Sequence, residues 1–220
     1  TVLVMDHFYQ LPMIGDPQNF MLECYGLLSA LARDTQRVRL SALVTGNTYR
    51  NPAVLAKTVT TLDIVSQGRA MLGIGAGWFE LEHDAFGIEF GTFTDRFEKL
   101  EESLQIVGPM LRGEKANLDG KWYTAKDAMN EPNPIGKVPI MIGGGGEKKT
   151  LRMVACYADE WNGWGTPEIM QHKGAVLERH CAELERDPVP RRHVDDVAEP
   201  LRLDLDVEDR EDDGHDRDRH

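Results

Sequence analysis

The fold is decided by the stretch Val138-Pro-Ile-Met-Ile-Gly-Gly-Gly-Gly-Glu-Lys-Lys-Thr150. Its first five residues predict a buried strand, and the residues from Glu147 onward predict an amphipathic helix. The four consecutive glycines between them form a short loop. Strand, loop and helix in this order make the unit from which parallel α/β folds are built.

The same unit recurs along the first 186 residues, where each helix serves as a crossover between parallel strands. The expected strands are residues 2–5, 38–45, 70–74, 138–142 and 161–164, and the expected helices are residues 19–34, 52–66, 94–111, 147–157 and 167–186. Residues 118–123 contain Asp-Gly and predict a hairpin. The segment 113–136 around this hairpin interrupts the alternation of strands and helices, and we expect it to influence the choice of substrate.

The chain is short for a closed barrel of eight strands, which takes about 250 residues. It has 220 residues, of which 41% are apolar and 28% charged, as in an ordinary globular protein. Five expected parallel strands fit either an open doubly wound sheet or a barrel that lacks elements at both ends. The fold class is therefore α/β, with one domain over residues 1–186.

The last 34 residues, 187–220, differ in composition from the rest of the chain. They hold 13 acidic residues and 6 arginines but no lysine and no aromatic residue, so they carry −7 of the net charge of −12. Such a segment cannot bury enough apolar surface to offset the entropy lost on ordering. We expect an acidic tail without regular structure.

Charge and cysteine content exclude several classes of function. A net charge of −12 argues against nucleic acid as a partner, because phosphate backbones require a basic surface. No apolar run approaches the roughly 20 residues that cross a membrane, and the first residues do not resemble a signal peptide, so we expect a cytoplasmic protein. The cysteines Cys24, Cys156 and Cys181 are too few and too widely spaced for a disulfide framework or a zinc site, and we expect them to be buried.

The glycine run 143–146 is the strongest candidate for an anion site. Bare backbone N–H groups at the start of a helix favour a phosphate, and Lys148 or Lys149 could add a charge. The run differs from a nucleotide-binding P-loop, because Lys148 occupies the position of the final glycine. The alternative interpretation is a flexible turn.

Three other loops follow expected strands. Asp6-His7 follows the first strand, and a histidine beside an acid can exchange protons near neutral pH. Residues 45–52 form a polar loop before a helix, and the glycines of residues 73–78 allow a ligand to approach the backbone. Each loop also has a purely structural interpretation. The acids around Glu82 and His83 are interpreted as a solvated first turn of a helix rather than as metal ligands.

Taken together, these stretches resemble the luciferase-like monooxygenase superfamily, and within it the branch of F420-dependent oxidoreductases. The segments that carry the resemblance are Val4-Met-Asp-His-Phe8, Leu43-Val-Thr-Gly-Asn-Thr-Tyr-Arg-Asn-Pro52, Ser66-Gln-Gly-Arg69, Leu72-Gly-Ile-Gly-Ala-Gly-Trp78, Arg96-Phe-Glu-Lys-Leu-Glu-Glu102 and Pro139-Ile-Met-Ile-Gly-Gly144. Their order and spacing also match, over about residues 1–186.

The resemblance implies a TIM-type (β/α) barrel with coenzyme F420, or alternatively FMN, at the carboxyl ends of the strands. It implies that His7 is the catalytic residue near the hydride-transfer carbon, and that a non-proline cis peptide at Ala42–Leu43 presses against the ring. The residues that it implies as cofactor contacts are Asp6, Ala42, Leu43, Thr45, Ala76, Gly77, Gly143, Gly144, Gly145 and Gly146. Asp6-His7 and the glycine run must then lie at the same end of the molecule.

The sequence also departs from the family pattern. Trp78 stands where sugar-phosphate dehydrogenases of the family have an acid, which argues against a sugar phosphate as substrate. The family's first strand and helix would precede Thr1, and its pattern ends after Pro188, so we expect a member truncated at both ends.

Three functions remain open at this point. The first is hydride transfer between F420 and a small organic substrate by an enzyme that forms a homodimer. The second is an FMN-dependent luciferase-like monooxygenase, or else a non-catalytic truncated remnant. The third is a nucleotide-binding module that uses the glycine run.

Overall fold

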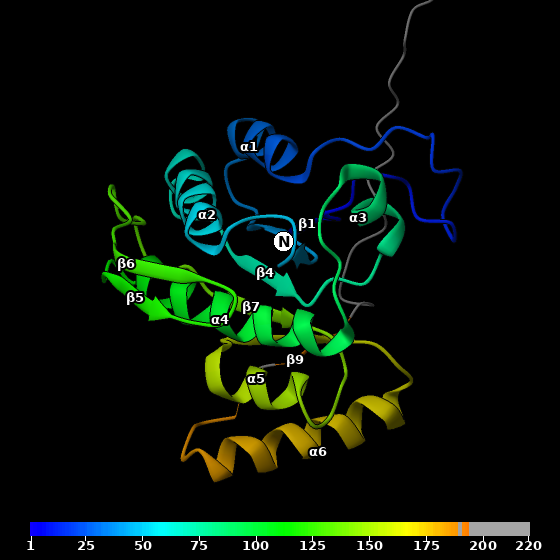
Figure 1. Cartoon of the computed structure of the whole chain (residues 1–220), viewed down its shortest axis with the longest axis vertical. Helices are drawn as coiled ribbons and strands as arrows, with labels where there is room; N and C mark the ends of the chain where they lie inside the picture. Colours follow the sequence, from blue (N-terminus) through cyan, green and yellow to red (C-terminus); the bar gives the residue numbers. More distant parts are fainter. Residues whose placement is uncertain (189–190, 194–220) are drawn as a thin grey trace, which may run out of the picture.

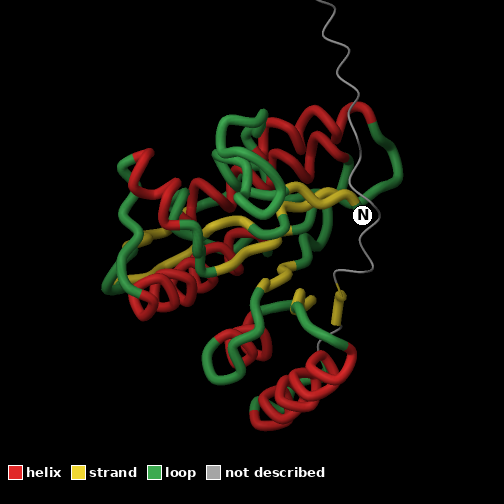
Figure 2. The backbone as a smooth tube through the Cα atoms, turned by 90° about the vertical axis from the view of Figure 1, so that its right-hand side faces the viewer, coloured by secondary structure: helices red, strands yellow, loops and turns green. Residues whose placement is uncertain are grey.

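The structure is a computed structural model that describes residues 1–188 and 191–193. Strands run through its interior, and helices lie around them (Figure 1, Figure 2). The strands are β1 (Val2–Val4), β2 (Leu40–Ala42), β3 (Thr45–Gly46), β4 (Leu72–Gly75), β5 (Ala116–Asp119), β6 (Thr124–Ala128), β7 (Ile140–Gly143), β8 (Glu160–Gly163) and β9 (Arg191–His193). The helices are α1 (Cys24–Asp34), α2 (Pro52–Ser66), α3 (Glu80–Phe86), α4 (Phe93–Leu111), α5 (Thr150–Tyr157) and α6 (Pro167–Glu183).

The inner layer consists of parallel strands. Strands β1 and β2 form a two-stranded sheet, and β3, β4, β7, β8 and β9 follow in that order in a five-stranded sheet. A parallel bridge between Leu40 and Ala70 connects the two sheets. The helices follow the same order, with α1 packed on α2, α2 on α4, α4 on α5 and α5 on α6. Parallel strands inside a layer of helices are the arrangement expected for part of a (β/α) barrel.

The expected strand 38–45 is divided into β2 and β3. The peptide bond between Leu43 and Val44 is cis and lies between the two strands, one residue beyond the Ala42–Leu43 bond that the resemblance implied. Before it, Val4 accepts a hydrogen bond from the Leu43 N–H, and after it, Thr45 pairs with Ile74 of β4. The chain therefore changes its pairing partner at the carboxyl ends of the strands.

Local sequence explains where the helices begin and end. Helix α2 matches the expected residues 52–66, because Pro52 occupies the first turn and the Asn51 side chain accepts from the N–H groups of Ala53 and Val54. Helix α1 begins at Cys24 instead of residue 19, because the Glu23 side chain caps it through the Gly26 N–H. Helix α4 begins beside a capping box formed by Thr92 and Asp95.

Arg69 fastens the loops at the amino ends of the strands. Its guanidinium group donates to the backbone carbonyls of Ala32, Thr35, Val38 and Ser66. These carbonyls belong to the last turns of α1 and α2 and to the connection that enters β2. The arginine of the Ser66–Arg69 motif therefore stabilises the fold and lies outside the candidate site.

The predicted hairpin is confirmed as the antiparallel pair β5 and β6. It packs on α4, where the Glu102 carboxylate accepts from the N–H groups of Lys121, Trp122 and Tyr123 (Figure 1). The hairpin connects the end of α4 to β7, so it leaves from the amino ends of the strands. For this topological reason the segment 113–136 does not line the cavity described below, and its expected influence on substrate choice is not supported.

The expected tail contributes one described element. Residues 191–193 form β9, which pairs in parallel with β8. The sheet therefore extends beyond residue 186, where the domain was expected to end. The rest of the tail, residues 189–190 and 194–220, lies outside the described residues. None of the described helices is long and apolar enough to cross a membrane.

The hydrophobic core fills the space between the strands and the helices. Leu40, Leu72, Ile142 and Trp161 supply its inner layer, and each is fully buried. Cys24 and Cys181 are buried as expected, whereas Cys156 is exposed on α5. All three are free thiols.

Candidate active site

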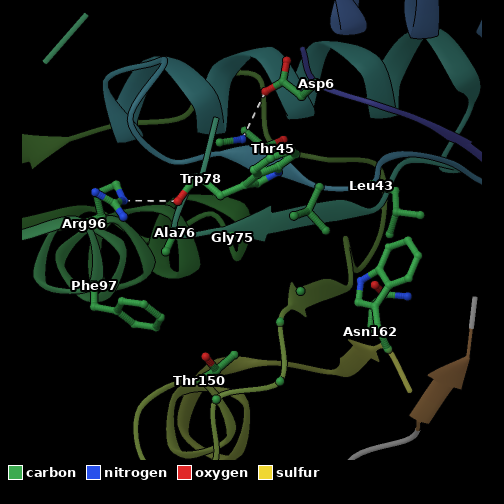
Figure 3. A pocket seen from close by; sticks show the side chains of 18 of the residues that line it. Asp6, Leu43, Thr45, Gly75, Ala76, Trp78, Arg96, Phe97, Thr150 and Asn162 are labelled. Atoms are coloured by element: carbon green, nitrogen blue, oxygen red, sulfur yellow. Dashed lines mark hydrogen bonds between the residues drawn. The ribbon is translucent and has the colours of Figure 1, made fainter. Parts of the chain in front are cut away.

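A cavity of about 450 Å³ opens at the carboxyl ends of the strands (Figure 3). Its lining comes from the ends of β1, β3, β4, β7 and β8 and from the first turns of α4 and α5. The lining residues are Asp6, His7, Leu43, Val44, Thr45, Gly46, Tyr49, Gly75, Ala76, Gly77, Trp78, Phe93, Arg96, Phe97, Gly143, Gly144, Gly145, Gly146, Thr150, Asn162 and Trp164. Asp6-His7 and the glycine run thus lie at the same end of the molecule.

Most of the residues predicted for the site share this cavity. They are Asp6, His7, Leu43, Thr45, Ala76, Gly77 and the glycines 143–146. Ala42 is the exception, because its side chain is completely buried in the hydrophobic core. Ala42 does not line the cavity, and its contact with the cofactor stays a prediction.

Asp6 is held by Arg50, which follows β3. Two hydrogen bonds, of 2.6 and 2.9 Å, join the guanidinium group to both carboxylate oxygens, and the Gly46 N–H donates a third. Arg50 also donates to Glu23 at the start of α1. Burial raises the pKa of Asp6, and the bonds from Arg50 and Gly46 oppose this rise.

His7 is bound to Glu82 of α3. Its Nδ1 lies 2.9 Å from the Glu82 Oε2, and Oε2 also accepts from the Tyr49 hydroxyl. The other carboxylate oxygen accepts from the N–H groups of Phe8 and Tyr9. Burial alone would raise the pKa of Glu82, but the hydrogen bonds from His7, Tyr49 and Tyr9 lower it below its ordinary value.

The interpretation of Glu82 and His83 as a solvated helical turn is wrong. Both side chains are completely buried, because α3 folds back over the loop that carries His7. His83 Nδ1 bonds the Phe79 carbonyl and its Nε2 bonds the Thr48 hydroxyl, so its role is structural. Among the described residues no group of His, Cys, Asp and Glu side chains is arranged to hold a metal ion.

The floor of the cavity is made by Val44 and the glycines around it. A Cβ atom at Gly75 would lie 2.8 Å from Val44 Cγ2, and one at Gly143 would lie 2.9 Å from Val44 Cγ1. Both distances are shorter than real Cβ contacts allow. Strand ends β4 and β7 therefore require glycine beside Val44, which leaves a floor made of backbone and one aliphatic side chain.

The glycine run 143–146 forms one wall of the cavity. Gly144 adopts a φ of 124°, donates to the Asn162 carbonyl and accepts from the Trp161 indole. No described carbonyl accepts the N–H groups of Gly145 and Gly146, and a Cβ at Gly146 would lie 3.0 Å from the Thr150 hydroxyl oxygen. Two backbone N–H donors and a hydroxyl group thus belong to residues of this wall.

A cation from α6, Lys173, lies beside the glycine run. A Cβ at Gly145 would collide with its Nζ, so the ammonium group sits against the loop. Lys149 instead lies 5.7 Å from the ring centroids of Phe93 and Phe97. The charge from Lys148 or Lys149 stays a prediction, and the structure adds Lys173, which is distant in sequence, as a further candidate.

Aromatic side chains surround the mouth of the cavity. Trp78, Phe93 and Trp164 are each more than half exposed. Arg96 lies over the Phe90 ring and donates to the Gly77 carbonyl, so its charge is already engaged (Figure 3). Sequence reasoning missed this aromatic rim, because its members come from separate segments of the chain with no shared pattern.

Known proteins are similar to this chain over part of its length. F420-dependent glucose-6-phosphate dehydrogenase of Microbacterium testaceum is 36% identical over 124 residues, which are 56% of this chain and 37% of that protein. The enzyme of the same name from Rhodococcus hoagii is 34% identical over 149 residues, or 66% of this chain and 43% of that protein. The chain therefore spans less than half the length of these curated relatives.

Solved structures show the same fold at lower identity. An F420-dependent secondary alcohol dehydrogenase in complex with an F420–acetone adduct superposes with a TM-score of 0.76 at 23% identity, over 88% of this chain and 58% of that one. The F420-dependent tetrahydromethanopterin reductase of Methanopyrus kandleri gives 0.69 at 21% identity, over 84% and 54%.

The family comparison covers most of the chain. The pattern of the luciferase-like monooxygenase family matches residues 1–195, which include every segment that lines the cavity and all of β9. The chain therefore belongs to the luciferase-like monooxygenase family, and its parallel strands and outer helices correspond to part of that family's (β/α) barrel.

Proposed function

We propose that this chain carries the cofactor site of an F420-dependent oxidoreductase, which transfers a hydride between F420 and a small organic substrate. One observation carries the proposal. The cavity brings together His7, a floor formed by Val44 and glycines, and a loop whose Gly145 and Gly146 N–H groups have no described carbonyl acceptor. These three features suit a flat redox ring with an anionic tail.

The residues present fit such a cofactor. The floor around Val44 is open only because Gly75 and Gly143 lack side chains, so a planar ring has room there. The N–H groups of Gly145 and Gly146, together with Lys173 and the Thr150 hydroxyl, suit a phosphate. When bound, the deazaflavin ring supplies the hydride chemistry.

The protein's own residues orient the reactants and move a proton. Val44 and the neighbouring glycines support the ring, and the glycine run fixes the tail. His7 lines the cavity and exchanges a proton with the reacting group, which is the role of a general acid or base. The aromatic rim of Trp78, Phe93 and Trp164 excludes water from the mouth.

The relatives support F420 over FMN. Curated relatives at 31–36% identity carry F420 in their names, as do two of the solved structures described above. Trp78 and the apolar rim favour a small organic substrate without a phosphate group. The cytoplasmic location and the homodimer stay predictions.

A titration of the purified chain with F420, FMN and ATP tests the proposal. Quenching of fluorescence measures the binding. We expect F420 to bind with the highest affinity and FMN to bind more weakly. His7→Ala should retain F420 binding, because the tail and floor contacts remain. Tighter binding of ATP would support the nucleotide-binding alternative, and binding of none of the three would support a non-catalytic remnant.

A further inference from the structure

Four groups meet the carboxylate of Glu82, and their arrangement constrains the protons of His7. Three of them, the N–H groups of Phe8 and Tyr9 and the hydroxyl of Tyr49, donate to Glu82. The fourth is His7 Nδ1 at 2.9 Å. An ionised carboxylate accepts hydrogen bonds and donates none, so Nδ1 must carry a proton to make this contact.

The remaining ring nitrogen of His7 then has a defined state. In the neutral imidazole one nitrogen donates and the other accepts, so a proton on Nδ1 leaves a lone pair on Nε2. Among the described residues no group bonds to Nε2, and His7 lines the cavity. The edges of Trp78 and Phe79, with centroids 5.7 and 5.8 Å from the ring, hold its plane.

We propose that Glu82 is a positioning residue that holds His7 as the Nδ1–H tautomer and presents the Nε2 lone pair to the cavity as a proton acceptor. Glu82 itself does not line the cavity, so it acts only through His7. The partner of Nε2 is then a hydroxyl or another proton donor. Only this last statement rests on the proposed function, since the tautomer is a property of the protein alone.

The variant Glu82→Gln tests the proposal, because it should reverse the direction of the hydrogen bond between His7 Nδ1 and residue 82. The N–H groups of Phe8 and Tyr9 cannot become acceptors, so they keep the amide oxygen on their side. The amide NH₂ group then faces His7 and Tyr49, and Nδ1 can remain bonded only as an acceptor. We therefore expect the proton of His7 to move from Nδ1 to Nε2.

Nitrogen-15 NMR of the histidine rings reads this change without cofactor or substrate. In mildly alkaline buffer the wild-type spectrum should show His7 protonated at Nδ1, and Glu82→Gln should show it protonated at Nε2. His83, whose Nδ1 bonds a backbone carbonyl, should stay protonated at Nδ1 in both and serves as an internal standard. Spectra of His7→Ala and His83→Ala assign the signals.

Two further variants separate the role of Glu82 from a general disturbance. Glu80→Gln, at an exposed position of the same helix, should leave the His7 signal unchanged. Tyr49→Phe removes one donor but keeps the carboxylate, so His7 should stay protonated at Nδ1. A wild-type His7 with its proton on Nε2, or a Glu82→Gln variant that keeps it on Nδ1, overturns the proposal.

Binding and turnover supply a second readout. Glu82→Gln should keep its F420 affinity within about threefold of wild type, because Glu82 does not itself line the cavity. Turnover should fall by roughly 10²- to 10⁴-fold, as expected for a lost proton acceptor. If the chain fails to bind F420 at all, the proposed function fails, whereas the tautomer is still decided by the wild-type spectrum.

Discussion

The two walls of the cavity are built in opposite ways. The wall that carries His7 consists of buried side chains bonded to one another, with Asp6 on Arg50 and His7 on Glu82. The wall of residues 143–146 is backbone, with one lysine against it. The first wall contributes to stability and fixes atoms in place, whereas the second offers donors to a ligand. Substitutions on the two walls should therefore separate stability from binding.

The largest effect is expected for Glu82→Ala. It removes the acceptor for four partly buried groups, and loss of one member of a buried charged network costs about 3–5 kcal/mol of unfolding free energy. Urea unfolding followed by circular dichroism measures this loss, with Glu80→Ala as the matched control. A loss as small as that of the control would show that this wall does not stabilise the fold.

Arg50→Met should have the next largest effect. It leaves the Asp6 carboxylate with only the Gly46 N–H as a partner, and hydrogen bonds to charged groups contribute about 1.5–3 kcal/mol. The same unfolding assay applies, and the double variant with Asp6→Asn should recover part of the loss. Strict additivity of the two single variants would argue against coupling between Asp6 and Arg50.

The stability supplied by Glu82 should depend on pH. Its pKa is lowered in the folded protein, so its contribution is complete above the unfolded value of about 4.3 and is lost as pH falls through the folded value. The difference in unfolding free energy between wild type and Glu82→Gln should therefore shrink as pH falls below the unfolded value. If this difference in unfolding free energy stayed constant from pH 7 to acidic pH, the pKa of Glu82 would not be lowered in the folded protein.

Gly144→Ala tests the other wall and should cost less. Gly144 has a φ of 124°, where a side chain is strained by about 1–3 kcal/mol. The variant should lower F420 affinity more strongly than stability, in contrast to Glu82→Ala. Gly136→Ala, where a Cβ would meet no atom within 4 Å, provides the control.

Lys173→Met should have the smallest effect on stability, within about 0.5 kcal/mol, because the side chain is only partly buried. Its effect should appear in binding, as a loss of roughly 3- to 10-fold in F420 affinity with a weaker dependence on salt. Lys148→Met, on the exposed turn after the glycines, should change neither quantity. Equal losses of F420 affinity for the two variants would show that Lys148 on the loop contributes as much charge as Lys173, which would contradict a special role for Lys173.

Local sequence was sufficient for the framework of the fold. Helix α2 could be bounded from Asn51-Pro52 and Gly68, and the hairpin from its Asp-Gly turn, because these signals act over a few residues. The cavity residues at strand ends could also be predicted, since parallel strands bring their carboxyl ends to one face. The resemblance to a known family placed the cis peptide within one residue of its position.

The bonds between the site residues could not be predicted. His7 and Glu82 are 75 positions apart, and Glu82 follows a pattern that also fits an exposed helical turn. The same holds for Lys173, which reaches Gly145 only because α6 packs on α5. Such pairs are set by the packing of whole elements, about which local propensity carries no information.

The indole of Trp161 gives the protein a built-in optical probe. It is fully buried and donates to the carbonyl of Gly144, so its emission should respond to any rearrangement of that loop. Trp78 and Trp164 at the mouth should be quenched by direct stacking, and Trp122 on the hairpin should remain a constant background. With Trp78 and Trp164 changed to Phe, the emission of Trp161 would report binding of the cofactor's anionic tail at the glycine run separately from binding of its ring at the mouth.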